Sequence, residues 1–442
     1  MKILRKVSLF SQLMMLIKSP FRDSRHHLID WIQIAILVFI APFLLFMQKS
    51  YIFVLIVIFL ILIFRGLLKK TFLENTILNF PIILLLISIF VSTIWISDLS
   101  HSLPRIVMIL YSIVFFYGLI ALLKTDRLIK AGVVSYLIAG FLLSLLSITG
   151  MSVLNVKHFD ILFKLKEKIP FIHFNLPGAR EGIHPNAVGG ILILFIPLFF
   201  VLIYSVLKNR KELHEILNSH VFKWFLWAGL IVCFLTLVLT QSRGAWLGLI
   251  IGSAVMLAAL SRKKNIFIIS SAVVSVLFSL VIVYSIGKLD STRFMVRSAE
   301  ETFDFRVQIW DIATPLIASH PFSGIGIDEF RYHPEMRYEL SHAHNKFIHL
   351  AVEIGMPAVI AYMAILIGIG YMAVVVWKTS ASRWYGQISL GLAAGQIAYL
   401  IFELTDMVRL GSKVGVFFWI SAGLITAIYN NTLEREAELG TR

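Results

Sequence analysis

Long apolar runs recur along nearly the whole chain, separated by short polar segments. Each run is long enough to cross about 30 Å of hydrocarbon as a helix, and the pattern predicts twelve spans. We place them near residues 30–47, 51–68, 77–97, 104–123, 130–149, 187–207, 223–240, 244–260, 266–286, 347–376, 387–405 and 414–429. The pattern therefore predicts an all-α polytopic membrane protein with about 12 transmembrane helices.

The run at 347–376 is too long for one helix perpendicular to the membrane. It contains Gly355-Met356-Pro357 near its start, and proline removes a backbone donor from a helix. We therefore expect a short helix or re-entrant piece before this tripeptide and a transmembrane helix after it.

Basic residues gather in alternate short loops, and this asymmetry sets the orientation. They lie in the N-terminal segment, around 65–70, 124–130, 208–223 and 262–264, and at 378–383. Cytoplasmic loops are enriched in Lys and Arg, so both termini are predicted to be cytoplasmic. Residues 1–29 have apolar positions at helical spacing between basic ones, which predicts an amphipathic segment on the inner leaflet. Residues 430–442 form a cytoplasmic tail, and the two long loops, about 150–186 and 287–346, lie outside.

Composition narrows the class of protein further. The chain is 58% hydrophobic and only 15% charged, which excludes a sizeable soluble domain. A net charge of +15 would suggest nucleic acid in a soluble protein. Here, cytoplasmic loops that face anionic membrane lipids explain much of it, so no nucleic-acid partner is expected. Cys233 is the single cysteine, which excludes an intramolecular disulfide.

The stretch LTQSRGAWLG contains an outside turn of almost no length between two predicted spans. Arg243 is thereby held near membrane depth, where an unpaired guanidinium is costly. One interpretation is that its side chain reaches up to the lipid headgroups. The interpretation we favour is that Arg243 binds an anionic group of a lipid.

The first long loop ends in NLPGAREGIHPNAVGG, directly before a span. Arg180, His184 and Asn186 lie here, and Arg180 is open to two interpretations, an active-site role or a simple connection between loop and helix. Asn186 suits an N-cap position, and Gly189-Gly190 would let another helix approach closely.

The second long loop carries Arg306 and Trp310 one helical turn apart, and Asp304 is suited to cap a helix that begins near Arg306. Further along, Gly324 and Gly326 predict a turn. A lone G-x-G with no preceding strand is weak support for nucleotide binding, so no nucleotide site is predicted.

The stretch SHAHNKFIHLAVEIG joins this loop to the next apolar run. Asn345 and the residues after it predict the start of a helix, with His344 at its mouth. His342 and His344 are open to three interpretations: a metal site completed by His349 or Glu353, a structural pair, or a base at the water–lipid boundary. Zinc normally takes three or four ligands, and histidine can hold a proton near neutral pH. We favour the base.

These motifs together resemble the bacterial O-antigen ligase/polymerase superfamily. The resemblance covers roughly residues 180 to 375. It rests on the order SRG after a span, R-x-x-x-W, HPFSGIGIDEF, and HAHN before an apolar helix. His344-Asn345 followed nine residues later by Gly355 is similar to the ligase pattern H-[NSQ]-x9-G-x-x-[GTY]. The last place of that pattern is Ala358 here.

The resemblance implies a C-type glycosyltransferase-like membrane fold with a large periplasmic loop. It implies a bacterial inner-membrane enzyme whose active site faces the periplasm. The donor would be a glycan on undecaprenyl diphosphate and the acceptor would be lipid A–core oligosaccharide. Many lipid-dependent glycosyltransferases hold a metal with a D-x-D pair, which the chain lacks, so no metal or other cofactor is expected. The implied roles are His344 as the catalytic residue, Arg243, Arg306 and Arg180 at the diphosphate, and His342 and Asn345 in support.

Three alternatives stay open. An O-antigen polymerase would use the same donor with a second lipid-linked glycan as acceptor. A protein O-oligosaccharyltransferase would glycosylate a periplasmic protein. A twelve-span secondary transporter would instead show two related halves and intramembrane charges along a pathway. The acids near span ends that could serve such a pathway are Glu353, Glu403 and Asp406.

Overall fold

The computed structural model describes residues 25–46, 51–69, 73–151, 166, 168–169, 183–208, 220–261, 299–336 and 342–438. Within these ranges the regular structure is helical, and the β-type pairing is an isolated bridge between Met151 and Ile183. The predicted all-α class is therefore confirmed. Arg180, the predicted span at 266–286 and the N-terminal amphipathic segment up to residue 24 lie outside the described residues.

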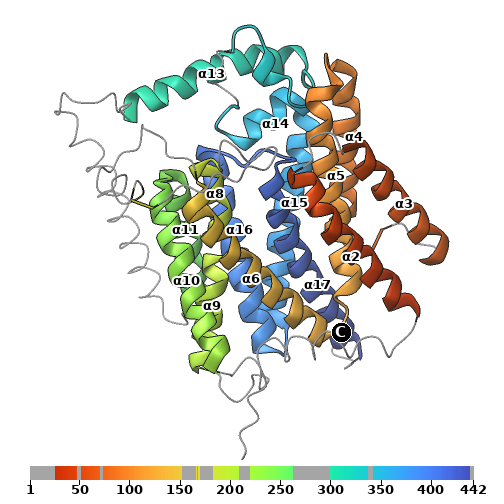
Figure 1. Ribbon diagram of the computed structural model, residues 1–442, viewed down its shortest axis with the longest axis vertical. Coiled ribbons are helices and arrows are strands. Elements are labelled where there is room, and N and C mark those ends of the chain that lie inside the picture. Colours follow the sequence, from red (N-terminus) through yellow and green to blue (C-terminus); the bar gives the residue numbers. More distant parts are fainter. Residues whose placement is uncertain are drawn as a thin grey trace, which may run out of the picture.

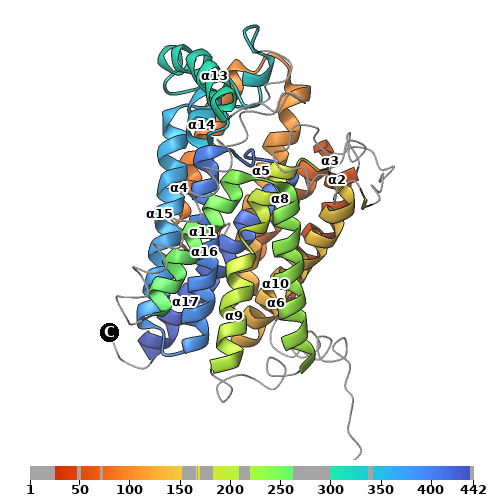
Figure 2. The same cartoon turned by 90° about the vertical axis from the view of Figure 1, so that its left-hand side faces the viewer.

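Long helices run side by side in a bundle (Figure 1). They are α2 (Arg25–Phe46), α3 (Tyr51–Lys69), α4 (Asn79–Ser92), α5 (Leu99–Leu122), α6 (Asp126–Gly150), α9 (Ile196–Lys208), α10 (His220–Thr240), α11 (Arg243–Leu260), α15 (Met356–Thr379), α16 (Arg383–Thr405) and α17 (Val416–Glu438). The short helices α8 (Pro185–Leu192) and α14 (Lys346–Ile354) lie near one end, and α13 (Ala299–Ser319) runs across that end (Figure 2). We call this the α13 end of the bundle.

Nine of the described helices are long and apolar enough to cross a membrane. Two further predicted spans, 30–47 and 77–97, coincide with shorter apolar stretches at Leu28–Ile40 and Asn79–Trp95. The structure therefore confirms a polytopic membrane protein, while the count of twelve spans stays a prediction.

The long run at 347–376 divides where the sequence predicted. Helix α14 ends at Ile354, and Gly355 adopts a φ of 92° before α15 begins at Met356. Only glycine takes this backbone conformation without strain. Pro357 then occupies the first turn of α15, where its missing N–H has no intrahelical partner to lose.

A row of glycines sets the position of α11 against α16. A side chain at Gly248 or Gly252 would collide with the backbone of α16 at Ala398 or Ala394. Such small residues at spacings of four let two membrane helices approach closely. Because the row continues to Gly244, which contacts Thr405, it brings the start of α11 beside the end of α16.

The predicted orientation places α13, which lies in the long loop 287–346, in the periplasm and the loop after α11 in the cytoplasm. We expect Glu300→Cys to react with a membrane-impermeant thiol reagent in intact spheroplasts, and Arg262→Cys to react only after permeabilisation. The native Cys233 is fully buried on α10, so the wild-type protein provides an unlabelled control. Labelling at position 262 alone in intact spheroplasts would show that the orientation is the opposite of the predicted one.

Candidate active site

Asn345 forms the cap that starts α14. Its side-chain oxygen accepts hydrogen bonds from the backbone N–H groups of Phe347 and Ile348, at 2.9 and 3.1 Å. The predicted helix start is therefore confirmed. His344 directly precedes the cap and has a φ of 50°, a left-handed conformation that costs free energy for a residue with a Cβ. The Asn345 side chain also donates to the carbonyl of Leu404 at 3.2 Å, which joins this turn to the end of α16.

Asp406 contacts His344, whereas the sequence offered it only as an acid of the transporter alternative. It follows the last residue of α16, and its Oδ1 lies 3.2 Å from Nδ1 of His344. Its Oδ2 accepts a hydrogen bond from the side chain of Asn186 at 2.6 Å. Burial raises the pKa of Asp406, but the hydrogen bond and the charge of His344 outweigh this effect and hold the pKa below its usual range. The carboxylate is therefore ionised at neutral pH.

His342 packs against His344, with 4.2 Å between the ring centroids. The backbone N–H of His344 donates to Nδ1 of His342 at 3.2 Å, and Nε2 of His342 lies 4.0 Å from Oδ1 of Asp406. Burial, followed by the charge of His344, lowers the pKa of His342 to about 3. His342 is therefore a neutral imidazole that braces the turn rather than a group that titrates near neutral pH.

Asn186 does not cap α8, which corrects the sequence interpretation. The cap is His184, whose Nδ1 accepts from the backbone N–H of Asn186 at 3.2 Å, because Pro185 is suited to be the first helical residue. Asn186 thus points its amide at Asp406 instead. The predicted close approach at Gly189-Gly190 is confirmed: these glycines pack against Ser242 and Phe402.

A buried ion pair fixes the segment that carries Asp406. Nζ of Lys346 lies 2.9 Å from Oε1 of Glu403 and donates to the carbonyl of Val408 at 2.7 Å. The hydroxyl of Tyr362 donates to the other oxygen of Glu403 at 2.7 Å. Because these contacts lie on both sides of Asp406 along the chain, they fix the position of its carboxylate relative to His344.

Two arginines approach this group from different helices. Arg243 is the first residue of α11, and Arg306 lies in α13; both are half-buried. Their positive charges are near enough to repel each other. Burial lowers the pKa of Arg306, and the nearby charge of Asp406 offsets this in part. No carboxylate of the described residues lies within 4.0 Å of either guanidinium.

The helix that carries Arg306 is anchored to residues 342–345, which we call the histidine turn. The indole N–H of Trp310 donates to the carbonyl of Ala343 at 2.8 Å. Helix α13 begins at Ala299, so Asp304 lies inside the helix and the prediction that it caps the helix is wrong.

The HPFSGIG stretch forms the turn that the sequence predicted, with positive φ at Gly324 and Gly326. The backbone N–H groups of Ile325 and Gly326 donate to the carbonyls of Val352 and Glu353, at 2.9 and 3.1 Å. These carbonyls would otherwise lack partners at the end of α14. The motif is therefore a helix-terminating turn that holds α14, and with it the histidines, beneath α13.

His342, His344 and Asp406 form a group that could hold a metal ion, with ligand atoms within 4.8 Å of one another. The sequence had suggested His349 or Glu353 as the third ligand, but these two contact each other at 3.3 Å instead. The hydrogen bonding of His342 does not suit a metal. Because its Nδ1 accepts a backbone N–H, its proton belongs on Nε2, the nitrogen that faces Asp406. Metal binding through Nε2 would require the other tautomer.

We therefore expect EDTA to leave the activity of the purified protein unchanged within about twofold, because the tautomer of His342 and the two nearby arginines disfavour a cation. The measurement is the glycan transfer that the family resemblance implies, in detergent with and without chelator, and extensive dialysis against chelator serves as the stricter condition. Loss of activity that one divalent ion restores would assign the three residues to a metal.

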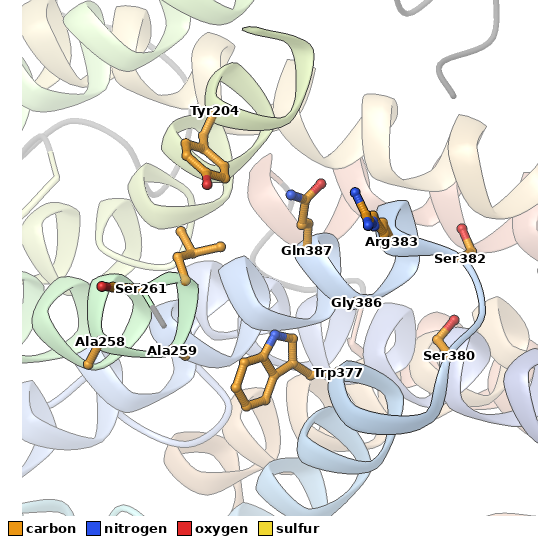
Figure 3. A pocket seen from close by; sticks show the side chains of 11 residues that line it. Tyr204, Ala258, Ala259, Ser261, Trp377, Ser380, Ser382, Arg383, Gly386 and Gln387 are labelled. Carbon is orange, nitrogen blue, oxygen red and sulfur yellow. The ribbon is translucent and has the colours of Figure 1, made fainter. Parts of the chain in front are cut away.

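A cavity of about 750 Å³ lies away from the histidine turn, where α9 and α11 end and α16 begins. Figure 3 shows Tyr204, Gln387 and Arg383 among its lining side chains. It has one cation and neither a carboxylate nor a histidine among the described lining residues. The histidine turn is therefore the better candidate for chemistry.

Comparison with known proteins relates part of the chain to a known family. Residues 228–363 match the sequence family described as O-Antigen ligase. The matched segment includes Arg243, Arg306, His342 and His344, and it ends before Asp406. No curated protein matches the chain significantly.

Proposed function

Because the chain belongs to the O-antigen ligase/polymerase superfamily, we propose that it is an O-antigen ligase. It would transfer a glycan from undecaprenyl diphosphate to lipid A–core oligosaccharide at the periplasmic face of the bacterial inner membrane. Family membership and the apolar helices already imply a membrane enzyme that handles lipid-linked glycans. The donor, the acceptor and the residue roles are the proposal.

One observation carries the proposal: two half-buried guanidinium groups without a salt-bridge partner among the described residues adjoin a hydrogen-bonded His–Asp pair. Guanidinium groups near membrane depth are costly unless an anion neutralises them. A diphosphate fits them because arginine binds phosphate oxygens through two parallel hydrogen bonds. Arg243 and Arg306 are therefore the proposed diphosphate ligands, and Arg180, outside the described residues, is a further candidate.

The proposed reaction is a single displacement with inversion at the anomeric carbon. The acceptor hydroxyl oxygen forms a bond to that carbon while the bond to the diphosphate oxygen breaks, and undecaprenyl diphosphate departs. Arg243 and Arg306 stabilise the negative charge that develops on the leaving group. Undecaprenyl diphosphate is already a good leaving group, so the reaction needs no nucleotide.

His344 would accept the proton of the attacking hydroxyl. Its Nδ1 is engaged by the ionised carboxylate of Asp406, so Nε2 is the nitrogen suited to take the proton. The carboxylate orients the ring and stabilises the imidazolium that forms, as a carboxylate does for histidine in other general-base pairs. His342 and Asn345 are positioning residues, because they brace the turn and cap α14.

The transporter alternative receives less support from the acids. Glu403 is paired with Lys346, Asp406 with His344, and Glu353 with His349. Each acid that the sequence offered for a proton pathway thus has a partner in a structural or catalytic contact. The polymerase alternative uses the same donor and the same chemistry, so the acceptor alone distinguishes it.

Deletion of the gene distinguishes these functions through the surface lipopolysaccharide. We expect loss of the protein to leave long glycan chains on the lipid carrier and to leave lipid A–core without them. Gel profiling of lipopolysaccharide, together with extraction of lipid-linked glycans, measures both pools. Wild-type protein supplied from a plasmid should restore the pattern, and protein with His344→Ala should not.

Two other patterns would contradict the ligase assignment. Lipid A–core that bears a single repeat would identify a polymerase. An unchanged lipopolysaccharide with unglycosylated periplasmic proteins would identify a protein O-oligosaccharyltransferase.

A further inference from the structure

A second cationic cluster lies near the α13 end of the bundle, formed by residues that the proposed reaction does not use. Asp328 receives three guanidinium groups: Nε of Arg105 at 3.5 Å, Nη1 of Arg409 at 3.4 Å and Nη1 of Arg331 at 4.0 Å. We call these four residues the Asp328 cluster. They come from α5, from the turn after Gly326 and from the segment after α16.

The Asp328 cluster has more positive than negative charge. Of the described carboxylates, Asp328 is the one within 4.0 Å of the three guanidiniums. Glu353 lies nearby, but burial, followed by the charge of Asp328, raises its pKa to about 8, so it is largely neutral at pH 7. Burial, together with the charge of Arg105, lowers the pKa of Arg409 to about 10, which still leaves it protonated. Two positive charges are therefore unmatched within the cluster.

Exposure distinguishes the arginines from their carboxylate. The side chain of Asp328 is 7% exposed, whereas those of Arg105 and Arg409 are 22% exposed and that of Arg331 is 36% exposed. Asp328 is therefore more deeply buried than the three guanidinium groups that it contacts, and each arginine side chain is partly accessible. Such an arrangement presents several N–H groups to an anion that approaches from the membrane surface.

Buried polar atoms beside the cluster also lack partners. Nδ1 of His349 and Oε1 of Glu353 are buried without a hydrogen bond among the described residues. Both residues line a small pocket together with Arg105, Asp328 and Arg409. Its volume of about 10 Å³ has room for about one water molecule. An anion would thus sit at the mouth of the pocket, on the guanidiniums, with a water beneath it.

The Asp328 cluster lies near the histidine turn. Its arginines belong to other elements of the fold than Arg243 and Arg306 do. Arg409 follows Asp406 by three residues, and its charge acts on His342. Arg243 and Arg306 belong instead to α11 and α13. The histidine turn therefore lies near two cationic groups that come from different elements, since Asp406, the partner of His344, acts on Arg306 and Arg409 acts on His342.

We propose that the Asp328 cluster binds a phosphate ester carried by a second membrane lipid, so that two lipid-borne anions flank His344. The assignment of that lipid to the glycan acceptor rests on the proposed function, because a transferase must hold both substrates at one base. The anion site itself does not rest on it. An ordinary anionic phospholipid offers the same chemistry, and binding measurements separate the two sources.

The test compares wild type with Arg105→Gln/Arg331→Gln in detergent, and native mass spectrometry measures lipid binding. The probes are diphosphorylated lipid A, its dephosphorylated form, phosphatidylglycerol and undecaprenyl diphosphate. We expect wild type to bind diphosphorylated lipid A at least tenfold more tightly than the dephosphorylated form. The double variant should lose this preference and still bind undecaprenyl diphosphate, while Arg383→Gln, a matched change that lines the cavity of Figure 3, should keep both.

Each outcome decides the proposal. Equal binding of phosphatidylglycerol, lost in the same variant, supports the anion site and assigns it to phospholipid headgroups. No preference for phosphate in wild type, or an unchanged preference in the double variant, overturns the site. Thermal melting verifies the fold, and Arg331→Gln alone, which alters the most exposed and most distant of the three contacts, repeats the test if the double variant unfolds. None of these readouts requires transfer activity, so a failure of the proposed function remains distinguishable.

Discussion

His344→Ala is expected to lower the rate of glycan transfer by at least about a hundredfold, because general-base catalysis typically contributes a factor of 10² to 10⁴. Binding of the lipid-linked donor should stay unchanged, since the proposed ligands of its diphosphate are Arg243 and Arg306. The measurement is an in vitro transfer assay on detergent-purified protein, paired with donor binding by native mass spectrometry.

Variants of the neighbouring residues make this prediction specific. Asp406→Asn keeps the shape of the side chain but removes the charge that stabilises the imidazolium, so it should lose most transfer activity with normal donor binding. His342→Ala should have an intermediate effect, because His342 braces the turn through its contact with the backbone of His344. His349→Ala should affect mainly packing and thermal stability. Substantial turnover by His344→Ala together with an inactive His342→Ala would move the base to His342.

Arg243→Lys and Arg306→Lys are each expected to lower transfer by about tenfold or more, and the double variant by more than either. Lysine keeps the positive charge but offers a point charge where arginine offers a planar fork for two phosphate oxygens. Loss of one donor that stabilises a developing anion costs a factor of about 10² in comparable sites. Donor binding should weaken as well, which distinguishes these variants from His344→Ala.

Arg383→Lys provides the matched control, since it lies outside the histidine turn and its neighbours, at the start of α16. Protein level and membrane insertion should be normal for all of these variants. Full activity in both Arg243→Lys and Arg306→Lys would contradict a diphosphate grip and leave the headgroup-anchoring interpretation of Arg243.

Local sequence signals predicted local structure well in this protein. The division of the long run at Gly355-Met356-Pro357 was predicted from the conformational limits of glycine and proline, and α14 and α15 meet there. Asn345 was predicted to start a helix and caps α14. Gly324 and Gly326 were predicted to form a turn and have positive φ. These features depend on a few adjacent residues, so the chain encodes them without tertiary context.

The incorrect predictions concern cap positions, where several residue types satisfy the same rule. His184 directly precedes α8 and Asn186 is the second residue of this helix, and either side chain can accept a backbone N–H. The structure gives the cap to His184 because Pro185 begins the helix. Asp304 was placed before the start of a helix that in fact begins at Ala299. In both cases the residue at which the helix starts decided the role of the side chain.

The sequence by itself determined that this is an all-helical membrane protein and where its long apolar run breaks, and it singled out the histidines and arginines that we propose for the site. It also determined the family resemblance, which residues 228–363 bear out. These properties follow from hydropathy and from motifs contained in short stretches of chain.

Only the tertiary structure decided which distant residues complete the site. Asp406 lies 62 residues after His344 and Asn186 lies 220 residues before Asp406, so no local spacing connects them. The close contact of α11 with α16 and the ion pair of Lys346 with Glu403 bring these segments together. Helix packing depends on the matching of whole surfaces rather than on adjacent residues. For this reason the partner of the proposed base became apparent only once the helices were assembled.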